Sequence, residues 1–220
     1  MIILDPVSVS EAARYMGVKG EPDETVRHLI EKADKKARMA ITPKYVYRVS
    51  DVEFSDRGVR LKNLGLVLHG NDIQSHLEGC GKAVVFAATL SAEADKLIRQ
   101  AEVTDMAEAL AMDCVCSALI EQVCNKVEDE IFQEIKASYR TWRFSPGYGD
   151  LPISIQDELL KVLNAQRRIG LTVTNENIML PSKSVSAIIG VSEQPVAARS
   201  NKCEFCNMRG KCGFSSHCKK

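Results

Sequence analysis

Residues 143–148 read Arg-Phe-Ser-Pro-Gly-Tyr, and this stretch decides how the C-terminal half of the chain is interpreted. Pro146 and Gly147 predict a rigid turn whose glycine lets a ligand approach the backbone closely. Arg143 can hold a carboxylate with two parallel hydrogen bonds, and Tyr148 would present an aromatic face and a hydroxyl beside it. Spacing alone favours a plainer alternative, a surface turn with an arginine ion pair.

The residues after this turn predict a helix followed by closing strands. Ser154 and Asp157 form a capping-box pattern for a helix over residues 155–168, and Gly170 is expected to end it. Short apolar stretches follow, with Pro181 confined to a connection. These stretches predict strands at residues 171–173, 177–180 and 184–191.

The residues before the turn predict helices around a short antiparallel meander. A period of two between Lys44 and Val67 predicts the meander, and the apolar run at residues 83–88 is short enough to be a buried strand. Helical periodicity and capping residues predict helices that start at Ser8 or Ser10, at Pro22 and Asp23, at Asn71, at Ser91, and at Thr104 or Asp105, the last being the longest. The predicted class is therefore α+β, an antiparallel sheet flanked by helices.

Bulk composition excludes several classes of protein. Lys plus Arg and Asp plus Glu both number 29, so no net field would collect nucleic acid or anionic lipid. No apolar run approaches the roughly 20 residues that span a bilayer, and Asp5 interrupts the apolar start too early for a signal sequence. We therefore expect a cytoplasmic protein without nucleic-acid or membrane partners.

Eight cysteines in a reducing compartment predict thiols or metal ligands rather than disulfides. Four of them lie scattered inside periodic segments, where a free cysteine behaves as a small hydrophobe. We interpret these four as core residues rather than ligands: Cys80, Cys114, Cys116 and Cys124.

The other four cysteines crowd into residues 203–220 and predict a metal site. Four closely spaced thiolates suit tetrahedral zinc or an iron-sulfur cluster, and spacing does not separate the two. His217 could replace one thiolate, and the alternative is a disordered tail with unliganded thiols. The predicted ligands are Cys203, Cys206, Cys212 and Cys218.

The turn and its downstream segments resemble the activation (reactivation) domain of cobalamin-dependent methionine synthase. The similarity covers about residues 143–190, with a weaker echo in the long helix from Asp105. The residues that carry the resemblance are Arg143, Pro146, Gly147 and Tyr148, then Leu171-Thr172, Met179 and Pro181, and Ser184-Val185-Ser186.

The resemblance implies a site and a chemistry. In the family this loop holds S-adenosylmethionine against cobalamin carried by another module, which implies that Arg143 contacts the ligand carboxylate and Gly147 offers a backbone contact. Tyr148 would face the cofactor as the catalytic position, and Ser145 and Pro146 complete the binding loop. The family's reaction returns oxidised cob(II)alamin to methylcobalamin, using an external electron and a methyl group from S-adenosylmethionine.

Three departures from the family pattern are visible. The family's acidic contact to the ligand's amino group lies in an N-terminal segment that does not align with this chain. An acidic position of the long helix falls on Ser117, and the tyrosine pair after the final strand is replaced by Val191-Ser192-Glu193. None of the four histidines lies in the family's Asp-x-His-x-x-Gly cobalamin signature, so the resemblance implies that cobalamin arrives on a separate methionine synthase module or related corrinoid protein.

The expected organisation is an activation-domain-like body over residues 1–192, a polar linker over 193–202 and the metal-binding tail over 203–220. The leading hypothesis is a reactivation component of a methyltransferase. The tail keeps two alternatives open, an iron-sulfur or zinc electron-transfer adaptor that has lost S-adenosylmethionine chemistry, and a structural subunit held by zinc.

Overall fold

A six-stranded antiparallel sheet forms the centre of the computed structural model, which describes residues 2–196. Its strands lie in the order β3-β2-β1-β4-β8-β5. Their bounds are β1 Lys44–Ser55, β2 Gly58–Leu61, β3 Leu66–Leu68, β4 Lys82–Thr89, β5 Tyr139–Arg140 and β8 Ser184–Ser192, with a 3-10 turn η1 at Lys62–Leu64. The predicted meander and buried strand are thereby confirmed.

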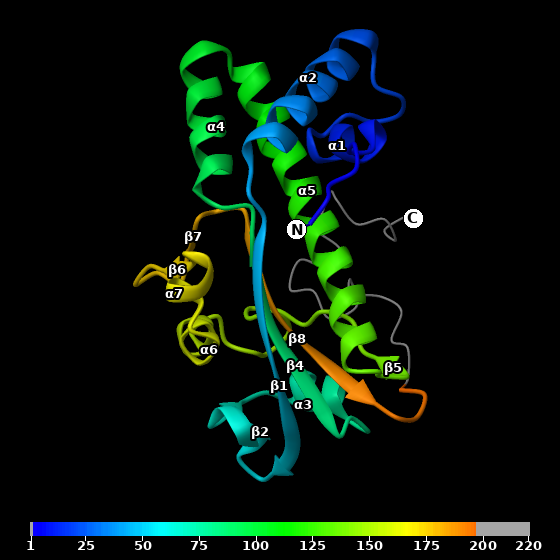
Figure 1. Ribbon diagram of the computed structural model, residues 1–220, viewed down its shortest axis with the longest axis vertical. Coiled ribbons are helices and arrows are strands. Elements are labelled where there is room, and N and C mark those ends of the chain that lie inside the picture. The colour runs from blue at the N-terminus through cyan, green and yellow to red at the C-terminus, as the bar shows by residue number, and fades with distance from the viewer. Residues whose placement is uncertain (1, 197–220) are drawn as a thin grey trace.

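Helices cover both faces of this sheet, so its central strand is buried on both sides. Figure 1 shows the sheet edge-on, with the long helix α5 on one side and α6 and α7 on the other. The first face carries α1 Val9–Tyr15, α2 Glu24–Ala40, α4 Ala92–Thr104 and α5 Met106–Glu134. The second carries α3 Asn71–Leu77, α6 Ile155–Leu163 and α7 Ala165–Ile169.

Strand β4 shows how one apolar run serves two cores. Val84 and Phe86 pack into the core beneath α5, whereas Ala83 and Val85 pack into the core beneath α6. Side chains alternate between the faces of a strand, and both faces are covered here, so the whole run is apolar. Strand β8 repeats this pattern with Ile189 on the first face and Ile188 on the second.

The four cysteines that fall in periodic segments are core residues, as predicted. All four are buried and none forms a disulfide: Cys80, Cys114, Cys116 and Cys124. Burial raises the pKa of the Cys80 thiol to about 11 and that of Cys116 to about 12. These two thiols therefore stay protonated at neutral pH, which is the inert form of a thiol.

The predicted helix over residues 155–168 is wrong in two details. Asn164 adopts a left-handed conformation (φ 52°, ψ 41°) and divides it into α6 and α7. Asparagine tolerates this conformation better than most non-glycine residues because its short side chain bonds locally. Ser154 makes no capping hydrogen bond, because its own backbone is already helical (φ −62°, ψ −21°) rather than extended.

Two further helix starts differ from prediction. Asn71 is the first residue of α3 rather than its cap, and the carboxylate of the distant Asp150 accepts from the backbone N–H groups of Asn71 and Asp72. Ser91 precedes α4, but its hydroxyl donates to the Thr42 carbonyl instead of capping the helix.

The strands predicted at residues 171–173 and 177–180 do not join the main sheet. They form β6 Thr172–Val173 and β7 Met179–Leu180, which pair only with each other as a small hairpin. Residues 197–220, which include most of the predicted linker and all of the predicted tail, lie outside the described residues. None of the helices in the described part of the chain is long and apolar enough to cross a membrane.

Candidate functional site

The loop between β5 and α6 is fixed at its start by the main sheet. Phe144 and Ile188 of β8 exchange two backbone hydrogen bonds of 3.0 and 2.8 Å. The turn then closes on itself, because the N–H of Tyr148 donates to the Ser145 carbonyl at 3.0 Å and that of Gly147 to the Leu151 carbonyl at 2.9 Å. Gly147 has a φ of +87°, a conformation that favours glycine, so the predicted rigid turn is confirmed.

The end of the loop is fastened to α3 by a reciprocal set of bonds. Asp150 accepts from the start of α3 at 2.6 and 3.0 Å, and the Asp150 N–H donates to the Asp72 carboxylate at 3.1 Å. Gly149 has a φ of +53°, and a Cβ there would lie 2.2 Å from Asp72 Oδ2. A side chain at position 149 would therefore displace the Asp72 carboxylate from the Asp150 N–H.

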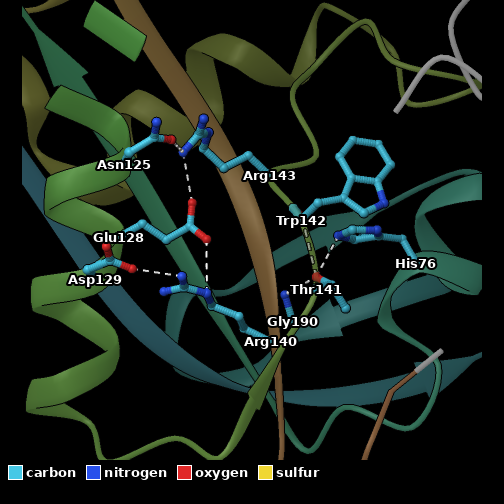
Figure 2. Close-up of polar contacts among 9 residues, drawn as sticks. All are labelled: His76, Asn125, Glu128, Asp129, Arg140, Thr141, Trp142, Arg143 and Gly190. Carbon is cyan, nitrogen blue, oxygen red and sulfur yellow. Dashed lines mark hydrogen bonds and ion pairs between the residues drawn. The ribbon is translucent and has the colours of Figure 1, made fainter. Parts of the chain in front are cut away.

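Arg143 is buried in a cluster of acidic and amide groups from α5. Only 8% of the residue is exposed. Its Nη1 donates to Asn125 Oδ1 at 2.9 Å and to Glu128 Oε2 at 2.8 Å, and its Nη2 donates to Glu121 Oε2 at 2.9 Å. Figure 2 shows the guanidinium turned toward Asn125 and Glu128 on α5.

A second arginine shares the same carboxylate. Arg140 Nε lies 3.2 Å from the other oxygen of Glu128, and Arg140 Nη2 lies 2.7 Å from Asp129 (Figure 2). Because one carboxylate contacts both guanidinium groups, the orientation of Arg143 is fixed from the side facing α5.

Arg143 keeps unused hydrogen-bonding capacity despite these contacts. A guanidinium has five N–H donors. The two hydrogens of Nη1 and one of Nη2 are used, whereas Nε and the second Nη2 hydrogen donate to no described residue. Two donors are therefore left for a ligand.

A cavity of about 200 Å³ opens beside this guanidinium. We call Glu121 and Arg143 its charged wall. We call Gln156 of α6, Met179 of β7 and Ser186 of β8, three uncharged lining residues in contact with one another, its neutral wall. The remaining lining residues are Ser145, Pro146, Tyr148, Ile153, Asn177, Ser184 and Val185.

A cluster of aromatic rings packs around residues 142–148. His76, Trp142 and Phe144 have ring centroids 4.8 to 5.2 Å apart, and Tyr148 lies 6.1 Å from Trp142 and from Phe144. Thr141 fixes this side, since its hydroxyl oxygen accepts from the Gly190 N–H at 2.7 Å and lies 2.8 Å from His76 Nε2 (Figure 2). Tyr148 lines the cavity and is 41% exposed, so the cavity reaches the surface beside it.

Comparison with known families gives a match over residues 80–200 to the family described as vitamin B12 dependent methionine synthase, activation domain. The match spans more than half of the 220 residues. The chain belongs to this family.

A solved structure described as the MetH reactivation domain bound to AdoHcy is also similar to this chain. It has a TM-score of 0.64 at 14% identity, over 86% of this chain and 76% of that chain, which shows a shared fold. Comparison with curated protein sequences finds no match.

The activation-domain match contains the whole cavity, because every lining residue falls between Glu121 and Ser186. The structure brings four of the five predicted binding residues into this lining: Arg143, Ser145, Pro146 and Tyr148. Gly147 does not line the cavity but forms the turn that joins Pro146 to Tyr148. The predicted metal ligands Cys203, Cys206, Cys212 and Cys218 lie outside the described residues.

Sequence reasoning about the activation domain missed Glu121 and Gln156. It placed the family's acidic helix position on Ser117, whose hydroxyl contacts Lys183 instead, and Glu121 lies one helical turn further on. A signal was present, because Glu121, Asn125 and Glu128 have the i, i+4, i+7 spacing of one helix face. In a helix whose other positions are largely apolar, such a polar stripe indicates a buried partner such as Arg143.

Among residues 2–196, no group of three or more histidine, cysteine or acidic side chains is arranged to hold a metal ion.

Proposed function

We propose that this chain binds S-adenosylmethionine in the cavity beside Arg143 and supports reductive methylation of cob(II)alamin on a separate corrinoid protein. One observation carries the proposal: a buried arginine with two unused donors stands beside a carboxylate in a cavity, in a member of the activation-domain family. A structure of similar fold is described as bound to AdoHcy, the demethylated form of that ligand.

The charged wall suits the amino-acid end of such a ligand. The free donors of Arg143 can hold the carboxylate with two hydrogen bonds. Glu121, whose side chain is 44% exposed, can accept from the ammonium group while it keeps its pair with Arg143. An α-amino acid carries these opposite charges two bonds apart, which matches a wall with one group of each sign.

The mouth of the cavity suits a flat apolar partner. Tyr148 and Ile153 are both exposed lining residues, at 41% and 46%. Aromatic and aliphatic side chains at a cavity mouth favour contact with a large ring such as a corrin. We assign Tyr148 to the face that meets the cobalt-bearing side of the partner's cofactor.

The proposed reaction balances with one external electron. A reductant supplies it and reduces the cob(II)alamin substrate by one electron. The methyl–sulfur bond of S-adenosylmethionine then breaks, its electron pair stays on sulfur, and the methyl group bonds to cobalt. The products are methylcobalamin and S-adenosylhomocysteine, and the chain's role is to hold the methyl donor in line with the metal.

The cysteine cluster supports a second candidate function, electron transfer or metal-dependent adaptation. Cys203, Cys206, Cys212 and Cys218 suit an iron-sulfur cluster or zinc. Anaerobic purification followed by iron, sulfide and zinc assays and a visible spectrum tests this candidate. Stoichiometric iron and sulfide with visible absorption support an electron-delivering tail. Colourless protein with one zinc contradicts the redox role, and metal-free protein contradicts the site.

The main proposal is tested by following methylcobalamin formation by absorbance. The full chain is mixed with an inactivated cobalamin-carrying module, S-adenosylmethionine and a chemical reductant. We expect conversion to accelerate with this chain and to require S-adenosylmethionine. Conversion at the same rate without the chain, across several corrinoid modules, would contradict the proposal and favour the adaptor function.

A further inference from the structure

Gln156 on α6 is a buried amide in the neutral wall of the cavity. Only 2% of the residue is exposed. Its Nε2 donates to the hydroxyl oxygen of Ser186 at 2.6 Å and to the sulfur of Met179 at 3.1 Å. Both amide hydrogens are therefore committed, and these two contacts fix the rotation of the side-chain amide.

The other half of this amide has no partner in the protein. Gln156 Oε1 accepts from no described residue. Every fully buried side-chain nitrogen or oxygen in the described part of the chain has a hydrogen-bond partner, so this oxygen reaches open space. The space available to it is the cavity, which Gln156 lines.

Ser186 adds a donor beside this acceptor. Its hydroxyl oxygen accepts from Gln156, and its own hydrogen goes to no described residue. The neutral wall therefore offers a ligand one carbonyl acceptor, on Gln156, and one hydroxyl donor, on Ser186. The hydrogen bond between these two side chains keeps them side by side. A buried carbonyl that waits for a donor selects against ligands that cannot supply one, because leaving it unpaired costs free energy.

The division of polar groups between the walls decides which part of a ligand reaches Gln156. Both lining residues with formal charges, Glu121 and Arg143, lie on the charged wall. An amino-acid end is held there, so the neutral donor and acceptor groups of the rest of the ligand face the neutral wall. In S-adenosylmethionine those groups belong to the nucleoside.

We propose that Gln156 accepts a hydrogen bond from the nucleoside portion of the ligand, with Ser186 orienting it, and that this pair selects nucleoside sulfur compounds over free amino acids. This inference rests on the proposed function and adds the residues that set ligand specificity. It assigns a separate binding task to each wall.

The test is a matrix of three ligands and three proteins, measured by calorimetry or ligand-observed NMR. S-adenosylhomocysteine carries both ends, 5′-methylthioadenosine carries the nucleoside only, and methionine carries the amino acid only. The proteins are the wild type, Gln156→Met and Arg143→Ala. Gln133→Met, at an exposed position of α5, is the matched control.

The two substitutions are expected to give complementary patterns. Gln156→Met weakens S-adenosylhomocysteine and methylthioadenosine by about 5- to 30-fold and leaves methionine within twofold. Arg143→Ala weakens S-adenosylhomocysteine and methionine and leaves methylthioadenosine within about threefold. General loss of structure would weaken all three ligands in parallel, and the thermal midpoint of each variant checks for it.

Three outcomes would overturn the inference. If Gln156→Met and a second variant, Gln156→Leu, bind both nucleoside ligands within twofold of the wild type, Gln156 does not contact the nucleoside. If the folded variants lose methionine as strongly as methylthioadenosine, the assignment of the walls is wrong. If the wild type binds no S-adenosylhomocysteine, both the proposed function and this inference fail. The first two outcomes contradict only the inference and leave the proposed function intact.

Discussion

The charged and neutral walls of the cavity are built by different parts of the chain and held in different ways. Arg143 of the charged wall donates hydrogen bonds to three side chains of α5, so removing one of them leaves the others in place. Gln156 of the neutral wall depends on one hydrogen bond to Ser186 and one weak contact to Met179. The difference indicates that the charged wall is fixed before a ligand arrives, whereas the neutral wall completes its hydrogen bonds only with the ligand.

The largest expected effect is on ligand affinity when the charged wall loses its guanidinium. Arg143→Ala should weaken binding of S-adenosylmethionine by about 2–4 kcal/mol, because a charge-assisted pair is lost from a partly desolvated site. Arg140→Ala is the control, since Arg140 shares Glu128 but does not line the cavity. Titration calorimetry measures both, and equal affinity of Arg143→Ala and wild type would remove the carboxylate role.

The next effect concerns the fastening of the loop that joins the walls. Gly149→Ala should lower the free energy of unfolding by about 2–3 kcal/mol. The alanine would have to keep the left-handed backbone conformation of Gly149, and its Cβ would collide with Asp72. Gly170→Ala has a similar φ of +72° but open space around it, so it isolates the conformational cost of about 1 kcal/mol. Urea unfolding compares the two, and equal losses would show that the contact with Asp72 is unimportant.

A smaller effect on stability and affinity is expected at Glu128, the carboxylate that pairs with both Arg140 and Arg143. Glu128→Gln keeps the shape but removes the charge between Arg140 and Arg143, and should cost about 1–2 kcal/mol of stability. Asp129→Asn breaks only an exposed pair and should cost less than about 1 kcal/mol. Affinity for S-adenosylmethionine should fall only about fivefold in Glu128→Gln, because Asn125 and Glu121 still hold Arg143. A loss as large as that in Arg143→Ala would mean that one carboxylate alone orients the arginine.

The smallest expected effect is a difference in how salt changes the affinity of ligands for the two walls. Raising ionic strength from about 0.05 to 0.5 M should weaken methionine binding roughly two- to threefold, because charged contacts at a partly open wall are screened. Binding of 5′-methylthioadenosine should change by less than that, since the neutral wall uses no formal charge. The same salt dependence for both ligands would contradict the division of labour.

The sequence predicted the fold class and the loop better than the contacts that make the cavity. Periodicity and turn residues located the meander, the buried strand β4 and the turn at Pro146-Gly147, because these depend on local patterns. The break at Asn164 was missed, since asparagine can continue a helix or end it and tertiary packing decides. The cap of α3 was missed because Asp150 lies 79 residues from Asn71.

The composition of the charged wall could be predicted only in part. Arg143 was identified from its motif, but its partners belong to α5 and meet it through the packing of that helix against the sheet. The polar stripe of Glu121, Asn125 and Glu128 was readable, yet the sequence does not say which buried cation it meets. Gln156 carried no signal, because a single glutamine in an amphipathic helix is ordinarily a surface residue.

Titration of S-adenosylmethionine into the full-length wild-type chain tests the central claim most directly. We expect saturable binding of one ligand per chain, with competition by S-adenosylhomocysteine and no heat from adenosine diphosphate at the same concentration. Absence of binding at millimolar ligand, in protein that unfolds cooperatively and is therefore folded, would contradict the account.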